Sequence, residues 1–378
     1  TRSRPTLLLG AALLVVAACG SDDEAADSTS VTSSETTSID AGPGETESSE
    51  METASDADGV ADRSTDADPV DEAETRVITD MAGRDVEIPV DPQRVVILDW
   101  RHTAPMAVTL GFVPAGVVSS EYTGGEDGYI QYLESFGGPQ GDLSEVADVG
   151  AGGETNLEAV AEIEPDLILT YSPGTTSDVP LEAELSQIAP VVGIAAQSGA
   201  PLDSQRFLAD VLGVTDVFEE RLAVYESEVS ALRDELSGQF AALTYNIIDQ
   251  YAPDGNYYNY DVTEFAWRPD IAVLSDLGAQ QAQAVVDELG GEVLPQISVE
   301  TLDSYDADMI FVSTWNDVPI DSDALAILQN TAAAENGQLI QTNVDLWGYP
   351  SGVEGHLAVL ADLEDILADR DLVVDVVE

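Results

Sequence analysis

Tryptophan and arginine are the residues of this sequence best suited to hold a small ligand. Two of the four tryptophans are each followed at once by an arginine, as Trp100-Arg101 and Trp267-Arg268. A guanidinium binds anionic oxygens through paired hydrogen bonds and stacks on rings, and an indole offers a large apolar face. An ion pair is the alternative role for each arginine, because the chain contains 73 Asp and Glu residues.

Several aromatic residues follow segments that we expect to be strands. In open α/β sheets, ligands bind beyond the carboxyl ends of the strands, so residues in these positions are candidates for a binding site. The candidates are Trp100, Arg101, His102, Tyr122, Tyr171, Tyr258, Trp267, Arg268, Trp315 and Trp347. We predict that they outline an aromatic cleft. The alternative role for these aromatic residues is to fill the seam between two lobes.

The composition excludes several classes of protein. The chain has 378 residues, a formal net charge of −61, one Cys, and no Lys among its 12 basic residues. A disulfide framework, a Cys-rich zinc site and nucleic-acid binding through a basic field are therefore excluded. There is no nucleophile elbow and no phosphate-binding P-loop, so we expect neither an enzyme nor a cofactor. Two histidines, His102 and His356, are too few for a directly bound metal ion.

The pattern of the first residues predicts an export signal followed by a membrane anchor. Residues 1–18 combine basic and polar residues with an apolar run that is too short to span a bilayer. Cys19 stands at the expected cleavage point in a segment that resembles a bacterial lipobox, which implies lipidation of this residue and attachment to the membrane. Residues 19–75 are acidic and poor in large apolar side chains, so we expect a disordered tether.

The remaining sequence alternates β-rich runs with helical stretches, which predicts an α/β fold. The expected strands are Val95–Leu98, Pro114–Val118, Leu167–Thr170, Val191–Ile194, Leu243–Ile248, Met309–Val312 and Leu339–Ile340. An apolar stripe recurs at spacings of three and four between Phe218 and Leu236, which predicts one long helix over 216–237. We therefore predict two lobes, each a mainly parallel sheet covered by helices, at 76–203 and 239–378, with connecting helices over 204–238.

A short pattern occurs once in each predicted lobe. Asn156 and Ser298 each stand two residues before a glutamate, Glu158 or Glu300, and an aspartate follows each glutamate by eight residues. Each copy predicts an N-capped helix and then a buried strand. A favourable interaction with the helix dipole is a sufficient reason for a glutamate in the first turn.

Three motifs make the chain resemble a known family. They are Thr79-Asp80-Met81-Ala82-Gly83-Arg84, then Asp91-Pro92-Gln93-Arg94-Val95-Val96, and Asn156-Leu157-Glu158 followed by Pro165-Asp166-Leu167-Ile168. Together they resemble the iron–siderophore substrate-binding lipoproteins of ABC importers, over about residues 76–367. The resemblance implies two lobes joined by one rigid helix, with a ligand cleft between them. It also implies that one surface glutamate per lobe, here Glu158 and Glu300, docks on arginines of the permease.

These observations predict a monomeric, lipid-anchored receptor on the outer face of the cell membrane. It would capture a ferric siderophore and deliver it to an ABC permease, with the iron held by the siderophore. The alternative is a corrinoid or haem receptor of the same fold, for which His102 would be the axial ligand. The sequence leaves open which siderophore binds, and whether the Gly- and Asp-rich stretch from Glu121 to Gly153 lines the cleft or binds calcium.

Overall fold

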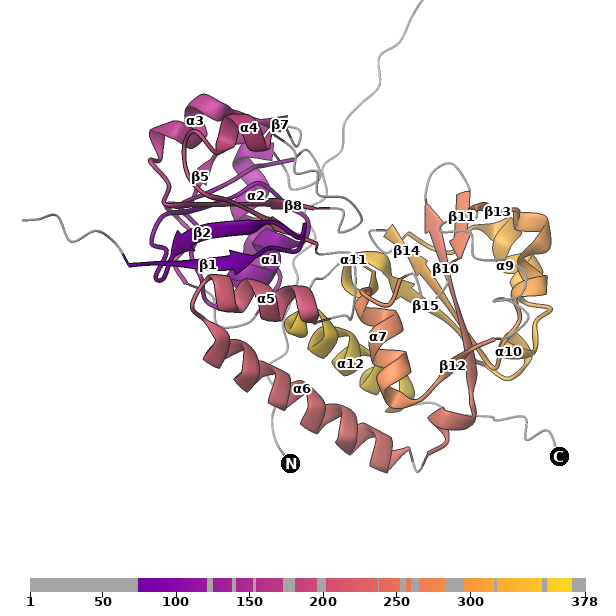
Figure 1. Cartoon of the computed structure of the whole chain (residues 1–378). Coiled ribbons are helices and arrows are strands. Elements are labelled where there is room, and N and C mark those ends of the chain that lie inside the picture. The colour runs from indigo at the N-terminus through magenta and orange to yellow at the C-terminus, as the bar shows by residue number, and fades with distance from the viewer. Residues whose placement is uncertain are drawn as a thin grey trace, which may run out of the picture. The chain divides into compact units, whose positions relative to one another are not determined.

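The computed structural model (Figure 1) contains two α/β lobes, and residues Ala67–Glu378 form one compact unit. The residues that it describes are 74–120, 125–137, 141–151, 154–172, 181–195, 202–236, 238–251, 256–259, 265–282, 296–315, 318–348 and 352–368. Predictions for Cys19, for the signal and tether and for Tyr122 lie outside these residues. Within the described ranges, no helix has both the length and the apolar character needed to cross a membrane.

The first lobe is built on a parallel sheet, as predicted. Its strands follow the order β5-β4-β3-β8-β9. They span Ala147–Asp148 (β5), Gly116–Val117 (β4), Val95–Ile97 (β3), Leu167–Tyr171 (β8) and Val191–Ile194 (β9). The helices are α1 (Thr103–Val108), α2 (Gly125–Glu134), α3 (Leu157–Glu162) and α4 (Glu182–Leu185), and β6 (Gly150–Ala151) pairs with β7 (Glu154–Thr155). β3 and β9 are buried throughout, as expected for strands covered on both faces.

An antiparallel hairpin of β1 (Thr75–Thr79) and β2 (Asp85–Pro89) precedes the first sheet and was not predicted. The turn between the two strands contains the motif that ends at Arg84, and Asp80 fixes its conformation. The buried Asp80 carboxylate accepts hydrogen bonds from the backbone N–H groups of Ala82 and Arg84. It also accepts from the Arg84 guanidinium and from the backbone N–H of Gly193 in β9. The motif therefore attaches the hairpin to the edge of the sheet.

The predicted long helix is confirmed as α6, Thr215–Glu235, which follows α5, Asp203–Val211. At 1.5 Å per residue, its 21 residues extend about 32 Å. Figure 1 shows α6 running alongside α5, α7 (Pro269–Leu277) and α12 (Val353–Ala368). The Tyr225 hydroxyl donates to Asp276 of α7 over 2.6 Å, and Arg221 forms an ion pair with Glu354 of α12, so both helices of the second lobe are attached to α6.

The side chain of Gln205 provides a second connection between the lobes. Its amide nitrogen donates to the backbone oxygen of Met106 in α1 over 3.2 Å, and its oxygen accepts from the backbone N–H of Val353 over 2.8 Å. Val353 is the first residue of α12 in the second lobe. Gly352 lies against this amide at φ +84°, where an added Cβ would approach the Gln205 side chain to 2.5 Å. Only glycine fits this junction without strain.

The second lobe is a mixed sheet with the order β13-β11-β10-β14-β15, in which β12 also pairs with β10. β10 (Thr244–Tyr251), β14 (Met309–Thr314), β15 (Leu339–Asn343) and β12 (Gln280–Gln281) are parallel, whereas β11 (Asn256–Asn259) pairs antiparallel with both β10 and β13 (Gln296–Ile297). Its helices are η2 (Phe240–Ala242), α7 (Pro269–Leu277), η3 (Val299–Tyr305), α9 (Ser322–Leu328), α10 (Ala332–Glu335), α11 (Val344–Trp347) and α12 (Val353–Ala368). The mainly parallel character predicted for this lobe is confirmed.

The aspartates of the repeated pattern have the same role in both lobes. Asp166 precedes β8 and accepts hydrogen bonds from the backbone N–H groups of Gln93 and Arg94, just before β3. Asp308 precedes β14 and accepts from the backbone N–H and the hydroxyl of Thr244, at the start of β10, both at 2.7 Å. Each carboxylate therefore holds the amino-terminal ends of two neighbouring parallel strands in register.

Candidate functional site

The carboxyl end of β3 continues into a turn that presents Trp100 and Arg101. The buried carboxylate of Asp99 accepts hydrogen bonds from the backbone N–H groups of Arg101, His102 and Thr103, at 3.1, 3.4 and 3.0 Å. It also accepts from the Thr103 hydroxyl over 2.7 Å. Asp99 is thus the residue that fixes the conformation of the predicted binding segment. Sequence reasoning missed it, although an Asp side chain commonly accepts a hydrogen bond from the backbone N–H two residues further on in a turn.

Trp100 lies among aromatic and cationic neighbours at this edge of the first sheet. Its ring meets the ring of Tyr132 from α2 edge to face, with centroids 6.0 Å apart. The Arg101 guanidinium lies 5.9 Å from the centroid of the Trp100 ring. Tyr171 ends β8, the neighbour of β3, and both Trp100 and Tyr171 are partly exposed. The first sheet therefore presents three aromatic rings and one guanidinium near the ends of adjacent strands.

His102 and Trp267 bring the two lobes into contact. Their rings meet edge to face with centroids 5.6 Å apart, although the residues lie 165 positions apart in the sequence. His102 is only 2% exposed, and this burial lowers its pKa to about 4, with Asp99 opposing the shift and Arg101 adding to it. The imidazole is therefore neutral at physiological pH. Both histidines of the chain are buried, so neither offers an exposed axial ligand for haem or cobalt.

The second lobe contributes Trp315 and Tyr258 near the ends of its strands. Trp315 follows β14 directly, and Tyr258 in β11 pairs with Asp249 near the end of β10; both are partly exposed. Two glutamines fix the segment after Trp315. Gln250 of β10 accepts from the backbone N–H of Asp321 over 2.7 Å, and Gln341 of β15 donates to the backbone oxygen of Val318 over 2.9 Å. Residues Val318 and Asp321 are therefore held by the two strands that flank β14.

The prediction that Arg268 binds the ligand is corrected by the structure. Its guanidinium is 3% exposed and forms ion pairs with Asp249 at 2.9 Å and with Asp270 at 2.6 Å, both carboxylates being fully buried. Burial raises the pKa of Asp270, and Arg268 opposes the shift. Gly348 lies against the same guanidinium, where an added Cβ would stand 3.0 Å from Nη2. The ion-pair alternative therefore applies to Arg268, and its charge stays inside the lobe.

Trp347 is the second correction. It is fully buried in α11, and its indole N–H donates to Asp362 of α12 over 2.7 Å. Its ring packs on Phe311 of β14 with centroids 4.9 Å apart. A tryptophan near a strand end is a candidate ligand contact, but here the first turn after β15 folds back on the sheet. Trp347 therefore belongs to the core of the second lobe.

Glu158 and Glu300 are exposed in the first turns of α3 and η3. Asn156 accepts from the backbone N–H of Glu158 over 3.1 Å, and Ser298 accepts from that of Glu300 over 3.4 Å, so the predicted N-caps are confirmed. The equivalence of the two copies extends from their caps to the aspartates that follow them. Both glutamates are therefore exposed at corresponding places of the two lobes.

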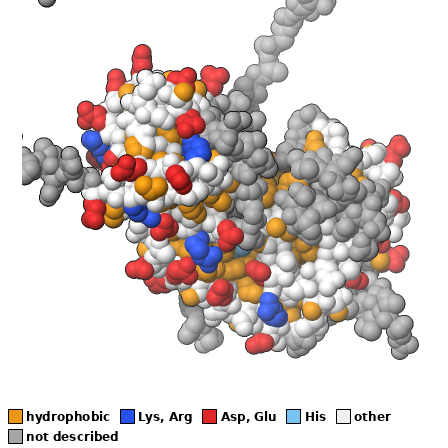
Figure 2. All heavy atoms as spheres, viewed as in Figure 1, with side chains coloured by type: hydrophobic (Ala, Val, Ile, Leu, Met, Phe, Trp, Pro, Cys, Tyr) orange, Lys and Arg blue, Asp and Glu red, His pale blue; other side chains and the backbone are white. Residues whose placement is uncertain are grey.

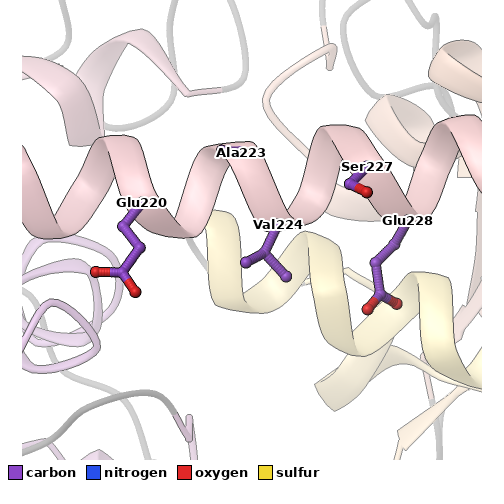
Figure 3. A pocket seen from close by; sticks show the side chains of 5 residues that line it. All are labelled: Glu220, Ala223, Val224, Ser227 and Glu228. Carbon is purple, nitrogen blue, oxygen red and sulfur yellow. The ribbon is translucent and has the colours of Figure 1, made fainter.

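Other features of the described residues lie apart from these strand ends. A hollow of about 390 Å³ on α6 is lined by Glu220, Ala223, Val224, Ser227 and Glu228 (Figure 3). All five residues belong to one face of one helix, so this is a surface depression that includes none of the predicted ligand residues. In the described parts of the chain, no group of three or more His, Cys, Asp or Glu side chains is placed to hold a metal ion.

Comparison with known proteins agrees with this architecture. Residues 95–346 match the family described as periplasmic binding protein, and because the match covers more than half of the chain, the protein belongs to this family. It is 26% identical over 308 residues to the probable siderophore-binding lipoprotein YfiY of Bacillus subtilis, covering 78% of this chain and 88% of that one. It is 22% identical over 293 residues to the Fe(3+)-citrate-binding protein YfmC of the same organism, covering 74% and 82%.

A solved structure confirms the fold. Staphylococcus aureus SirA, determined in complex with staphyloferrin B, matches with a TM-score of 0.59 at 23% identity, covering 78% of this chain and 99% of that one. At this level of identity the likeness concerns the fold alone. The predicted two-lobed α/β architecture with a long helix between the sheets is therefore confirmed, and the chain is a substrate-binding protein of the periplasmic binding protein family.

Proposed function

We propose that this protein is an extracytoplasmic, lipid-anchored receptor that captures a ferric siderophore and delivers it to an ABC permease. The contact between His102 and Trp267 carries the proposal, because it joins the segments that follow a strand in each of the two lobes. Membership of the periplasmic binding protein family and the names of the two Bacillus subtilis relatives support the same ligand class. No catalytic chemistry is part of the proposal.

The proposed ligand contacts are the partly exposed groups at the strand ends. They are Trp100, Arg101, Tyr171, Tyr258, Trp267 and Trp315. Aromatic rings pack on the apolar linkers and rings of a chelate, and Arg101 can donate hydrogen bonds to its oxygens. His102 is proposed as a contact between the lobes that supports Trp267. The iron would remain coordinated by the chelate, which the protein holds as transported cargo.

Fluorescence titration tests the ligand class. The full chain carrying Cys19→Ser would be titrated in 2 M salt with a ferric trihydroxamate, a ferric triscatecholate, ferric citrate, haem and cobalamin, and tryptophan quenching would be recorded. We expect saturable, submicromolar quenching by at least one ferric chelate. Truncating Trp100 and Trp267 together to Ala should weaken that binding at least tenfold while the urea midpoint shows that the lobes remain folded. Quenching by haem or cobalamin alone would refute the proposed ligand class.

We also propose that Glu158 and Glu300 dock on the permease. Their exposure and their corresponding positions in two capped first turns support this role. Glu158→Arg and Glu300→Arg should each abolish cellular uptake of the iron chelate without changing its affinity for the isolated receptor. Glu162→Arg in α3 and Asp303→Arg in η3 are matched controls, because both residues are exposed acids of the same two helices. Equal losses of uptake in the control variants would refute the assignment.

A further inference from the structure

The sequence supplies little positive charge to the strand ends where the proposed ligand contacts lie. Arg101 and Arg268 are the basic residues in the segments that follow the strands of the two sheets. The segments 118–124, 172–181, 195–202, 315–321 and 343–352 contain no Arg or Lys. Attraction of an anionic ligand by basic side chains of these segments therefore depends on two guanidinium groups.

One of these two groups is neutralised inside the second lobe. Arg268 is paired with Asp249 and Asp270, so two carboxylates surround one guanidinium. All three side chains are almost completely buried. This group of residues therefore adds no net positive charge to the field at the strand ends, and its guanidinium has no free donor face for a ligand oxygen.

The second guanidinium, that of Arg101, acts together with a carboxylate of each lobe on the side chain of Tyr132. Tyr132, whose ring contacts Trp100, reports this through its hydroxyl. Burial is the main cause of its raised pKa, Asp99 of the first lobe and Asp345 of the second raise it further, and Arg101 lowers it. Two carboxylates and one guanidinium therefore act on one point beside Trp100. Counted as formal charges, Asp99, Asp345 and Arg101 sum to −1.

The described surface visible in Figure 2 is rich in acidic side chains. Figure 2 shows acidic side chains spread over the visible described surface, with basic side chains isolated among them. The formal charge of the chain is −61. Both the formal charge of the local groups and that of the whole chain are therefore unfavourable for an anion.

We propose that the site selects ferric chelates that are uncharged or cationic, as ferric trihydroxamates are, over anionic citrate and catecholate chelates. This inference rests on the proposed function and names the substrate class of the same site. The aromatic rings of Trp100, Trp267 and Trp315 supply contact area that does not depend on ligand charge. The net negative charge then penalises each negative charge that a chelate adds.

Three chelates with the same iron coordination isolate the effect of charge. Ferrioxamine B carries one free ammonium group, its N-acetyl derivative is neutral, and its N-succinyl derivative carries a carboxylate. We expect affinity to fall in that order, about three- to tenfold in total at 0.1 M salt, for charges roughly 10 Å apart. At 2 M salt the difference should shrink below about twofold, since screening then acts within a few ångströms.

Two variants identify which carboxylate causes the difference in affinity between the cationic and the anionic derivative. Asp345→Asn should narrow the difference between the cationic and the anionic derivative, because it removes a carboxylate that acts beside Trp100. Glu335→Gln, an exposed acid in α10, removes the same formal charge elsewhere and should leave the difference unchanged. Circular dichroism at both salt concentrations would verify that each variant is folded.

The outcomes separate this inference from the proposed function. Tighter binding of the succinyl derivative than of ferrioxamine B at 0.1 M salt would overturn the charge selection, as would tighter binding of ferric citrate or a ferric triscatecholate than of all three hydroxamates. In both cases the receptor function would stand. Failure of every ferric chelate to bind in 2 M salt would instead overturn the proposed function.

Discussion

The buried ion pairs of Arg268 give a direct test of how the second lobe is stabilised. Replacing Arg268 by Met keeps much of the apolar volume of the side chain but removes the guanidinium that pairs with Asp249 and Asp270. Both carboxylates are fully buried, so they cannot gain compensating hydration without opening the lobe. We therefore expect Arg268→Met to destabilise the protein strongly.

The expected magnitude follows from the burial of the partners. Removing one partner of a buried ion pair costs about 3 to 5 kcal/mol, because the remaining charge is left uncompensated. For a domain of this size, 1 kcal/mol corresponds to a shift in Tm of about 2 to 4 °C, so Tm should fall by about 6 to 20 °C. Burial already raises the pKa of Asp270. Without Arg268 this carboxyl takes up a proton more readily, so the deficit should decrease as pH is lowered.

Thermal unfolding in 2 M salt, followed by circular dichroism between pH 5 and 8, would measure these effects. The triple variant Arg268→Met, Asp249→Asn, Asp270→Asn removes the unpaired charges and should recover most of the lost stability. It should also bind the preferred chelate with near wild-type affinity, because none of the three groups is proposed to contact the ligand. A variant Arg268→Met that keeps its Tm but loses chelate binding would refute this reasoning and restore Arg268 as a ligand contact.

Two further predictions concern the helical layer around α6. Burial lowers the pKa of His356 to about 4 from 6.5, so the folded state favours the neutral imidazole. This preference contributes about 3 kcal/mol to the free energy of unfolding above pH 6.5, and the contribution is lost as pH falls toward 4. Between pH 7.5 and 4.5, urea unfolding of His356→Gln should therefore lose about 2 to 3 kcal/mol less stability than the wild type; equal losses would contradict the assignment. Gly352→Ala should cost about 2 to 3 kcal/mol, because it adds a Cβ at positive φ against the hydrogen-bonded Gln205. Gly213→Ala is its control, with positive φ but no atom within 4 Å of the added Cβ, and should cost only about 1 kcal/mol.

Local patterns of the sequence determined the elements of the fold. Seven strands were expected from apolar runs, and each lies within or overlaps an observed strand, because parallel strands buried on both faces need continuous apolar residues. The stripe from Phe218 to Leu236 predicted α6 within two residues at each end, since a helical period over 21 residues is unambiguous. Asn156 and Ser298 predicted both caps. The hairpin β1–β2 and the antiparallel β11 were missed, because their half-exposed residues have no continuous apolar run.

The tertiary structure decided which candidate residues can meet a ligand. Trp100, Trp267, Trp315 and Trp347 all lie near strand ends in the sequence, yet only Trp347 is fully buried, because α11 folds its ring onto Phe311. The two Trp-Arg pairs have the same local sequence pattern. In the structure, however, Arg268 is buried between two carboxylates, whereas Arg101 is partly exposed.

The sequence by itself thus determined the type and order of the elements, which depend on residues close together in the chain. The contact of His102 with Trp267, and the pairing of Arg268 with Asp249, join residues that are distant in the chain or are separated by a strand and a turn. Such contacts depend on how the sheets and helices pack. A single sequence carries no local signal for that packing, so the charge and accessibility of the site were decided only by the three-dimensional structure.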